Sequence, residues 1–213
     1  MINNKVHLYY AEFGALISKL ETYQRYLSED ELTRAGRFHF PLDKNNFILA
    51  RGRLRELLGE HLTIPAAQIN FTYNKHGKPE VSQAIQFNLS HTKQAFLIAI
   101  TKEHAIGVDI ENMDRKVDLD GVAKQVFSSE EIAYIQAADD KTQAFYRCWT
   151  RKEAYVKALG TGIAAENLTS LTITPKPEVQ NVQLFDLPMQ NNHAMALAVL
   201  AKKDYVLCLM LGI

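Results

Sequence analysis

The spacing of hydrophobic residues near the start of the chain predicts one strand followed by helices. Residues 6–10 are β-branched or aromatic and indicate a strand. Apolar residues recur at helical intervals over residues 16–26, and a longer helical stripe runs over residues 43–60. Between them, Ser28 followed by Glu31 fits a capping box, in which each side chain accepts a hydrogen bond from the other residue's backbone amide. A further short helix therefore begins after Ser28.

Later apolar runs predict strands in the middle and at the end of the chain. Residues 69–73, 95–100 and 107–111 are strand-like, and the second run is apolar along its whole length. Beyond residue 168 short apolar segments alternate with polar ones, which is typical of a meander of strands. Those segments are residues 171–173, 182–185, 194–200 and 205–210.

Two helices are expected between these groups of strands. Ser128 is a suitable N-cap for a helix that ends at Ala137. Residues 143–159 form a longer helix, and Gly160 and Gly162 end it, because glycine readily adopts the left-handed conformation after a helix. The polar segment before them, residues 112–121, has the composition of a surface loop.

Composition narrows the class of protein. The chain has 213 residues, enough for one large domain or two of about a hundred. Its 24 basic and 24 acidic residues cancel, so no overall basic field points to nucleic acid. Cys148 and Cys208 form no disulfide framework, and no apolar run is long enough to span a membrane. These features predict a soluble cytoplasmic protein that binds neither nucleic acid nor a membrane.

Two segments bring acidic side chains toward a common point. On the strand at residues 107–111, Asp109 and Glu111 are two positions apart and point to the same side. On the long helix, Glu153 and Lys157 are four apart and lie on one stripe. Three carboxylates and a lysine would then meet, and such hard oxygen ligands suit Mg²⁺, which completes its coordination with phosphate oxygens. A diphosphate substrate fits this arrangement.

A basic segment lies in the first half of the chain. Residues 34–55 contain six Lys or Arg and one acid. They form either a solvated helical face or a phosphate-binding surface, since arginine matches phosphate oxygens with paired donors. The sequence leaves both interpretations open.

The chain resembles the Sfp-type 4'-phosphopantetheinyl transferases at these segments. The resemblance extends over about residues 28 to 162, with both halves of the family signature at the expected distance. The first half of the signature is Gly107-Val108-Asp109-Ile110-Glu111. The second half has the spacing W-x-x-K-E-A-x-x-K-x-x-G-x-G and consists of Trp149, Lys152, Glu153, Ala154, Lys157, Gly160 and Gly162. Three further elements of the family are Gly77-Lys78-Pro79, Phe87-Asn88-Leu89-Ser90-His91-Thr92 and the segment from Ser28 to Arg37.

The resemblance implies a fold and an activity. The expected fold is α/β (α+β), with two pseudo-symmetric lobes at residues 1–105 and 106–213, each a small antiparallel sheet packed with helices. The expected enzyme is a magnesium-dependent transferase that moves 4'-phosphopantetheine from coenzyme A to a serine of an apo acyl or peptidyl carrier protein. Adenosine 3',5'-bisphosphate is the other product.

The resemblance also assigns roles to residues. Asp109, Glu111 and Glu153 would hold Mg²⁺, and the catalytic residues would be Glu153, Lys157 and Asp109. Glu153 or a metal-bound water would take the serine proton. The residues expected to bind coenzyme A are Arg34, Arg37, Arg51, Lys78, Pro79, Ser90, His91, Lys152 and Lys157. Arg51 is included because Asn45 and Asn46 stand where relatives often carry an arginine.

Partners and alternatives complete the prediction. Carrier proteins of this kind are acidic, so the segment from Met113 to Leu119, which contains Arg115 and Lys116, is the candidate docking surface of a monomeric enzyme. One rival function is a noncatalytic binding module with the same fold. Such a module would be expected to lack one or more of the three carboxylates. Another is a magnesium-dependent phosphodiesterase in which the same carboxylates activate water. The carrier and its pathway are not predicted.

Overall fold

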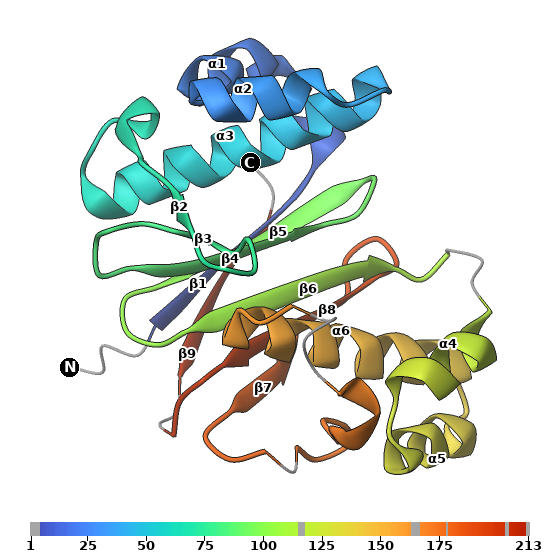
Figure 1. The fold of residues 1–213 in the computed structure, drawn as a ribbon. Coiled ribbons are helices and arrows are strands. Elements are labelled where there is room, and N and C mark those ends of the chain that lie inside the picture. The colour runs from blue at the N-terminus through green and yellow to red at the C-terminus, as the bar shows by residue number, and fades with distance from the viewer. Residues whose placement is uncertain (1–4, 115–117, 163–166, 178, 203–204, 212–213) are drawn as a thin grey trace.

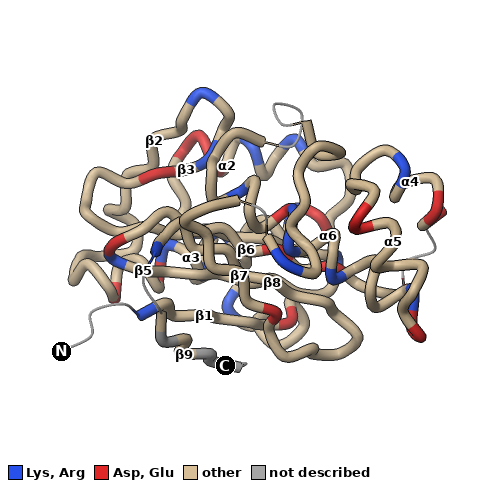
Figure 2. The backbone as a smooth tube through the Cα atoms, turned by 90° about the horizontal axis from the view of Figure 1, so that it is seen from below, with Lys and Arg blue, Asp and Glu red and all other residues tan. Residues whose placement is uncertain are grey.

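Two small β-sheets pack face to face, and helices cover the outer face of each (Figure 1). The computed structural model describes residues 5–114, 118–162, 167–177, 179–202 and 205–211. The expected mixed α/β fold is confirmed. Basic and acidic residues are interspersed along the backbone (Figure 2).

The first sheet has the strand order β4-β5-β1-β9. These strands are β4 (Gln86–His91), β5 (Ala95–Thr101), β1 (Lys5–Glu12) and β9 (Val206–Leu211). The pairs β4–β5 and β5–β1 are antiparallel, whereas β9 runs parallel to β1. The prediction of a C-terminal meander is therefore wrong for the last strand, because β9 joins the first sheet. By crossing to the first sheet, β9 covers an edge of β1 that would otherwise expose unpaired backbone groups.

The second sheet has the order β6-β8-β7 and is antiparallel. It contains β6 (Ile106–Asn112), β8 (His193–Val199) and β7 (Gln183–Asp186). The strand expected at residues 171–173 is wrong. A short 3₁₀ helix, η4 (Leu168–Ser170), precedes these residues, and the backbone amide of Ile173 donates to Glu131 Oε1 instead of to a neighbouring strand.

Helices of the first half lie over the first sheet (Figure 1). They are η1 (Phe13–Lys19), α1 (Leu20–Tyr26), α2 (Glu29–Gly36), α3 (Pro41–Leu62) and η2 (Ala66–Gln68). The single helix expected at residues 16–26 is thus 3₁₀ in its first part. The capping box at Ser28 and Glu31 is confirmed at the start of α2. The strand expected at residues 69–73 is reduced to β2 (Thr72–Tyr73), which pairs with β3 (Pro79–Glu80).

Helices of the second half are α4 (Leu119–Val126), α5 (Ser129–Ala137) and α6 (Lys141–Leu159). The expected N-cap at Ser128 and the long helix carrying Glu153 are confirmed. The loop expected at residues 112–121 is shorter than predicted, because α4 begins at Leu119 with Asp118 as its N-cap.

Alternate side chains of β1 pack into two different hydrophobic cores, one on each face of the first sheet. Val6, Leu8 and Tyr10 pack with apolar residues of β6 and β8 between the two sheets, whereas Tyr9 and Ala11 pack beneath α3. This follows from the two-residue period of a strand with both faces covered. The first sheet is thereby held between α3 and the second sheet.

Gly107 sets the distance between α6 and β6. A Cβ atom at this position would lie 2.1 Å from the backbone oxygen of Ala154 and 2.4 Å from the backbone nitrogen of Ala158. Only glycine therefore allows the helix to approach the strand this closely. The helix carries Lys157 and the strand carries Asp109, so this contact determines their separation.

A buried ion-pair network joins α2 to α3. Glu31 accepts hydrogen bonds from Arg51 Nε and Arg55 Nε, and the Arg55 contact is 2.7 Å long. Arg55, 1% exposed, also donates to the backbone oxygens of Ala66 and Ile69. Burial acts to raise the pKa of Glu31, but Arg51, the Ser28 amide and Arg55 outweigh it, so this pKa lies below its ordinary value. The network stabilises the short helix α2 on α3.

We expect Gly107→Ala to lower the free energy of unfolding by about 1–3 kcal/mol, the usual cost of overpacking a well-packed interior. Urea denaturation would measure this change. Gly14→Ala is the matched control, because nothing lies within 4 Å of a Cβ atom there. Equal stability of the two variants would contradict the role given to Gly107.

We expect Glu31→Gln to cost about 3–5 kcal/mol at neutral pH, because it leaves Arg55 buried without its carboxylate. A carboxyl group with a lowered pKa stabilises the fold above its unfolded pKa, and this contribution is lost as pH falls through its folded pKa. The difference from the unsubstituted protein should therefore shrink below about pH 4.5. Urea unfolding at several pH values tests this, with the exposed Glu29→Gln as control; a pH-independent difference would contradict it.

Candidate active site

Three side chains from three elements meet at the interface of the two sheets. Asp109 Oδ1 on β6 accepts a 2.9 Å hydrogen bond from Ser90 Oγ on β4 and a 2.6 Å bond from Lys157 Nζ on α6. Lys157 Nζ also donates to Ser90 Oγ over 2.9 Å. Asp109 and Ser90 are buried, whereas the Lys157 side chain is 30% exposed. The structure thus brings together three of the predicted site residues.

Asn88 aligns the two strands that carry these groups. Its side-chain oxygen accepts a 2.9 Å hydrogen bond from the backbone amide of Val108, so a side chain links β4 to β6. Asn88 belongs to a motif that the sequence displays, but its role was missed. The signal that could have identified it is its position two residues before Ser90, which places both side chains on the same face of the strand.

Glu153 and Glu111 flank this cluster. Glu153 Oε2 lies 4.0 Å from Lys157 Nζ, and Glu111 Oε1 accepts a 3.2 Å hydrogen bond from Trp149 Nε1. Trp149 stacks on Phe145, so the indole packs within the second half while it also contacts Glu111. The four charged side chains therefore lie on adjoining positions of β6 and α6.

Burial and like charges raise the pKa of Glu153 to about 7. Burial is the largest cause, Lys157 opposes it, and the carboxylates of Asp109 and Glu111 add to it. Burial tends to lower the pKa of Lys157, but Asp109 and Glu153 outweigh this effect and raise it. Lys157 is therefore a firmly held cation, and Glu153 is a carboxyl group that exchanges a proton near neutral pH.

The chemistry of this cluster suits a hard divalent cation. Among the described residues no three His, Cys, Asp or Glu side chains are gathered tightly enough to hold a metal ion as they stand. Asp109 Oδ2 is nevertheless buried without a hydrogen-bond partner. A buried carboxylate oxygen without a partner, beside two further carboxylates, is a donor set that fits Mg²⁺. The predicted ligands Asp109, Glu111 and Glu153 are compatible with the ion.

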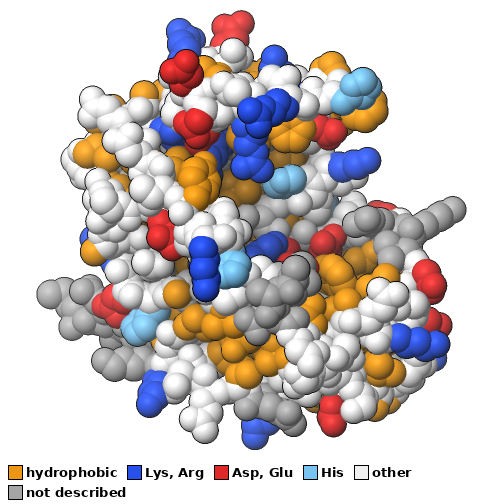
Figure 3. Space-filling model, viewed as in Figure 1, with side chains coloured by type: hydrophobic (Ala, Val, Ile, Leu, Met, Phe, Trp, Pro, Cys, Tyr) orange, Lys and Arg blue, Asp and Glu red, His pale blue; other side chains and the backbone are white. Residues whose placement is uncertain are grey.

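A cleft of about 830 Å³ reaches the cluster at Glu111, the one member of the cluster among its lining residues. Its walls come from the α2–α3 region, from the turn after β4 and from the end of β6, where Glu111 lies. Arg34 and His91 both line it, and the Arg34 guanidinium lies 5.2 Å from the ring centre of Phe47. The face of the molecule is hollowed between its two halves, and basic side chains gather above the hollow (Figure 3). The volume is within the range of ligand sites.

Ser90 and His91 point in opposite directions, as expected of neighbours on a strand. Ser90 is buried against Asp109, whereas His91 is exposed and lines the cleft. The turn that follows His91 is tied to the second sheet, because Thr92 Oγ1 lies 3.2 Å from Nε2 of the buried His193. No function was expected of His193; the structure gives it this supporting contact.

Of the three arginines predicted to bind coenzyme A, Arg34 lines the cleft, whereas Arg37 and Arg51 do not. Arg37 is exposed at the C-terminal end of α2 and does not line the cleft. Arg51 pairs with Glu31, donates to Tyr73 Oη over 2.7 Å and lies 4.0 Å from the ring centre of Phe71. The structure therefore brings one of these three arginines to the cleft.

Lys78 joins the Gly-Lys-Pro loop to the end of α6. Its Nζ donates to the backbone oxygens of Lys157 at 2.8 Å and Ile106 at 3.1 Å. Burial lowers its pKa to about 8. Lys78 and Pro79 line a separate cavity of about 250 Å³ beside Gly160. The loop is thus more than a hairpin turn, because it fixes the first half of the chain against α6.

The buried position of Lys152 contradicts its expected contact with coenzyme A. Its ammonium lies 2.5 Å from Glu131 Oε2 and donates to the backbone oxygens of Val126 and Leu168. Lys152 is 1% exposed. Because α6 buries this face against α5, Lys152 holds the helices together and does not reach the cleft.

The structure describes only part of the candidate docking segment from Met113 to Leu119. Residues 115–117, which include Arg115 and Lys116, lie outside the described residues. The backbone amide of Met113 donates to Asn192, and Leu119 begins α4. In the part of the chain that is described, no helix is long and apolar enough to cross a bilayer.

Comparison with known proteins agrees with the motifs. A family model for the 4'-phosphopantetheinyl transferase superfamily matches residues 105–209, and one for the N-terminal part of 4'-phosphopantetheinyl transferases matches residues 15–103. The family resemblance predicted from the sequence is confirmed.

Individual relatives support the same conclusion. The chain is 36% identical over 182 residues to the 4'-phosphopantetheinyl transferase HetI of Nostoc sp., covering 82% of this chain and 77% of HetI. It is 26% identical to Sfp of Bacillus subtilis, over 68% of this chain and 65% of Sfp. It is 29% identical to L-aminoadipate-semialdehyde dehydrogenase-phosphopantetheinyl transferase of Mus musculus, over 67% of this chain and 51% of the mouse protein. The chain belongs to the 4'-phosphopantetheinyl transferase superfamily.

Proposed function

We propose that the protein transfers 4'-phosphopantetheine from coenzyme A to a serine hydroxyl of an apo carrier protein, releasing adenosine 3',5'-bisphosphate. The observation that carries this proposal is the cluster of Ser90, Asp109 and Lys157 beside Glu111 and Glu153. Glu111 connects the cluster to a ligand-sized cleft, because it is one of the residues that line this cleft. Transfer of a phosphoryl group depends mainly on positioning and charge neutralisation, and this cluster offers both.

Each charged residue has a distinct part in this proposal. Lys157, held between Asp109 and Ser90, would neutralise charge that develops on the diphosphate. Glu153 in its ionised form would accept the proton of the carrier serine. Asp109, Glu111 and Glu153 would hold Mg²⁺, which neutralises the diphosphate when bound.

The wall of the cleft would hold the remaining phosphates. Arg34 and His91 line it from opposite elements, and a guanidinium presents paired donors to phosphate oxygens. Arg51 could bind a phosphate only if its ion pair with Glu31 were broken. Arg34 is therefore the stronger candidate to bind the 3'-phosphate of coenzyme A.

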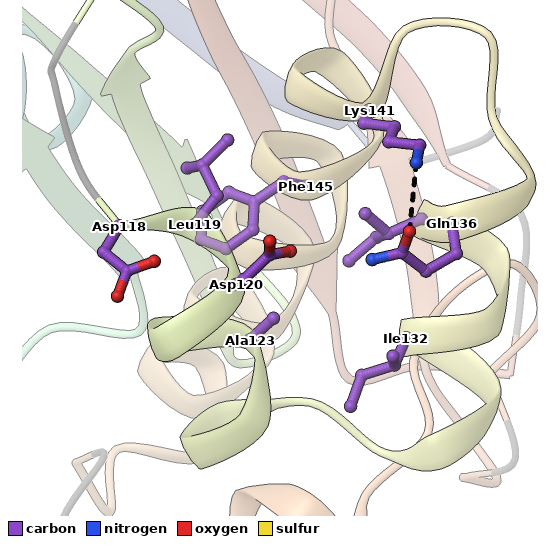
Figure 4. Close-up of a pocket in the computed structure, with 9 residues that line it drawn as sticks. Asp118, Leu119, Asp120, Ala123, Ile132, Gln136, Lys141 and Phe145 are labelled. Carbon is purple, nitrogen blue, oxygen red and sulfur yellow. Dashed lines mark hydrogen bonds between the residues drawn. The ribbon is translucent and has the colours of Figure 1, made fainter.

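The carrier would dock beside α4. Leu119, at the end of the predicted docking segment, lies over an apolar hollow of about 290 Å³ between α4, α5 and the start of α6. Leu119, Ala123, Ile132 and Phe145 converge on this hollow (Figure 4). An apolar hollow with a polar rim is suited to a transient protein contact. A monomeric enzyme is part of this proposal.

The test of the reaction is intact-mass spectrometry of several apo carriers incubated with the protein, coenzyme A and Mg²⁺. We expect a phosphopantetheine-sized mass gain that Asp109→Ala abolishes and that Lys157→Ala slows by about 10²–10³-fold, the usual effect of removing one transition-state donor. The exposed Lys176→Ala is the charge-matched control. Loss of coenzyme A without a carrier would indicate a phosphodiesterase, and no reaction with any carrier would contradict the transferase.

The metal proposal has a test that does not depend on activity. Trp149 is the sole tryptophan of the chain and donates to Glu111, so its fluorescence reports on the carboxylates. We expect Mg²⁺ to change Trp149 emission in a saturable manner, because Glu111 must turn toward the ion. Asp109→Asn should abolish the change. The same response from both proteins, or none from either, would argue against a metal at these carboxylates.

A further inference from the structure

A second cavity lies at the other end of the first sheet. It has a volume of about 200 Å³ and is lined by Lys5, His7, His61, Ile100, Thr101 and Lys102. On the ladder between β4 and β5, Ser90 pairs with Leu97, whereas Thr101 pairs with Gln86. The cavity is therefore about 13 Å along the strand from the Ser90 pair, at ~3.3 Å per residue. Among the described residues, its lining contains two lysines, two histidines and no acid.

The two histidines are in contact, and His7 leaves hydrogen-bonding capacity unused. His7 and His61 pack edge to face with ring centres 5.0 Å apart. His61 Nε2 lies 3.0 Å from Tyr9 Oη, whereas His7 Nδ1 is buried without a hydrogen-bond partner. A buried polar atom without a partner is rare in folded proteins and points to a missing ligand or water.

The electrostatic surroundings favour an anion. Burial, and then the charge of Lys5, lowers the pKa of His7; burial, His7 and Lys102 lower the pKa of His61. Lysine side chains of β1 and of the residue that follows β5 therefore act on the two imidazoles. A bound anion would offset this repulsion and permit both imidazoles to carry a proton.

Other charged and titratable side chains lie on the elements that surround the cavity. Glu60 and Arg53 of α3 act on Tyr9, as does Cys208 of β9, and none of these lines the cavity. The C-terminal end of α3 favours a protonated His61, because the end of a helix carries a partial negative charge. Glu103 follows the lining residue Lys102 and, like Glu60, is not among the described residues that line the cavity.

We propose that this cavity binds a dianionic tetrahedral oxyanion, namely free phosphate or the phosphate group of a monoester. Lys5 and Lys102 supply charge from the exposed rim, and the imidazole rings of His7 and His61 line the cavity. The volume equals roughly six waters at ~30 Å³ each, which is room for such an ion. The site is independent of the transferase proposal, because no residue of the carboxylate cluster contributes to it.

Binding here would be linked to stability and to pH. A ligand that binds only the folded chain raises its free energy of unfolding. It would join the end of α3 to the adjoining ends of β1 and β5. Because bound anion favours the protonated imidazoles, affinity should increase as pH falls through the pKa values of His7 and His61.

The test is an NMR titration of the His7 and His61 ring signals in buffer free of phosphate, coenzyme A and carriers. Sulfate is the first probe, since its charge stays constant from pH 5 to 8. We expect saturable shifts of both rings, raised pKa values for both, and at least a five-fold weaker affinity in Lys102→Gln. Lys19→Gln, which removes an equally exposed charge outside the cavity, should leave the affinity unchanged.

Two further titrations identify the source of the ion. Inorganic phosphate and O-phosphoserine are added separately; shifts with both indicate that monoesters enter, and shifts with phosphate alone indicate the free ion. The proposal is overturned if neither ring responds to any of the three anions, or if Lys19→Gln weakens binding as much as Lys102→Gln. Failure of this site would leave the carrier assay unaffected, so the two proposals fail separately.

Discussion

The close contact of α6 with β6 is the constraint on which the site depends. Without a side chain at Gly107, the helix backbone rests directly on the strand, and Lys157 reaches Asp109 within 2.6 Å. A helix displaced outward by the width of a methyl group would separate the ammonium from the carboxylate. The same displacement would pull the backbone oxygen of Lys157 from Lys78, which ties the first half of the chain to the helix end. Packing, charge pairing and the junction of the halves therefore share one contact.

Local periodicity explains why much of the site was predictable. Asp109 and Glu111 share a face because a strand repeats every two residues, and Glu153 and Lys157 share a stripe because a helix repeats about every four. The spacing within each motif therefore determined which side chains converge. The capping box at Ser28 was predictable for the same reason, since its two residues satisfy each other within one turn.

Long-range pairing explains what the sequence did not reveal. Lys152 has the same residue type and helix as Lys157, yet it faces Glu131 instead of the cleft, because its position on the helix points toward α5. The return of β9 to β1 and the bond from Val108 to Asn88 likewise join residues far apart in the chain. Such partners depend on which elements pack together, and periodicity within one segment carries no information about that.

The charge balance of the cluster connects its protonation to what it binds. Three carboxylates, Asp109, Glu111 and Glu153, lie around the single ammonium of Lys157, which leaves excess negative charge in a largely buried place. Protonation of part of the Glu153 population, whose pKa is raised to about 7, relieves part of this excess. A cation held by these carboxylates would offset the same excess charge and would favour the ionised form of Glu153. The same electrostatic imbalance therefore accounts both for the raised pKa of Glu153 and for the suitability of the cluster as a cation site.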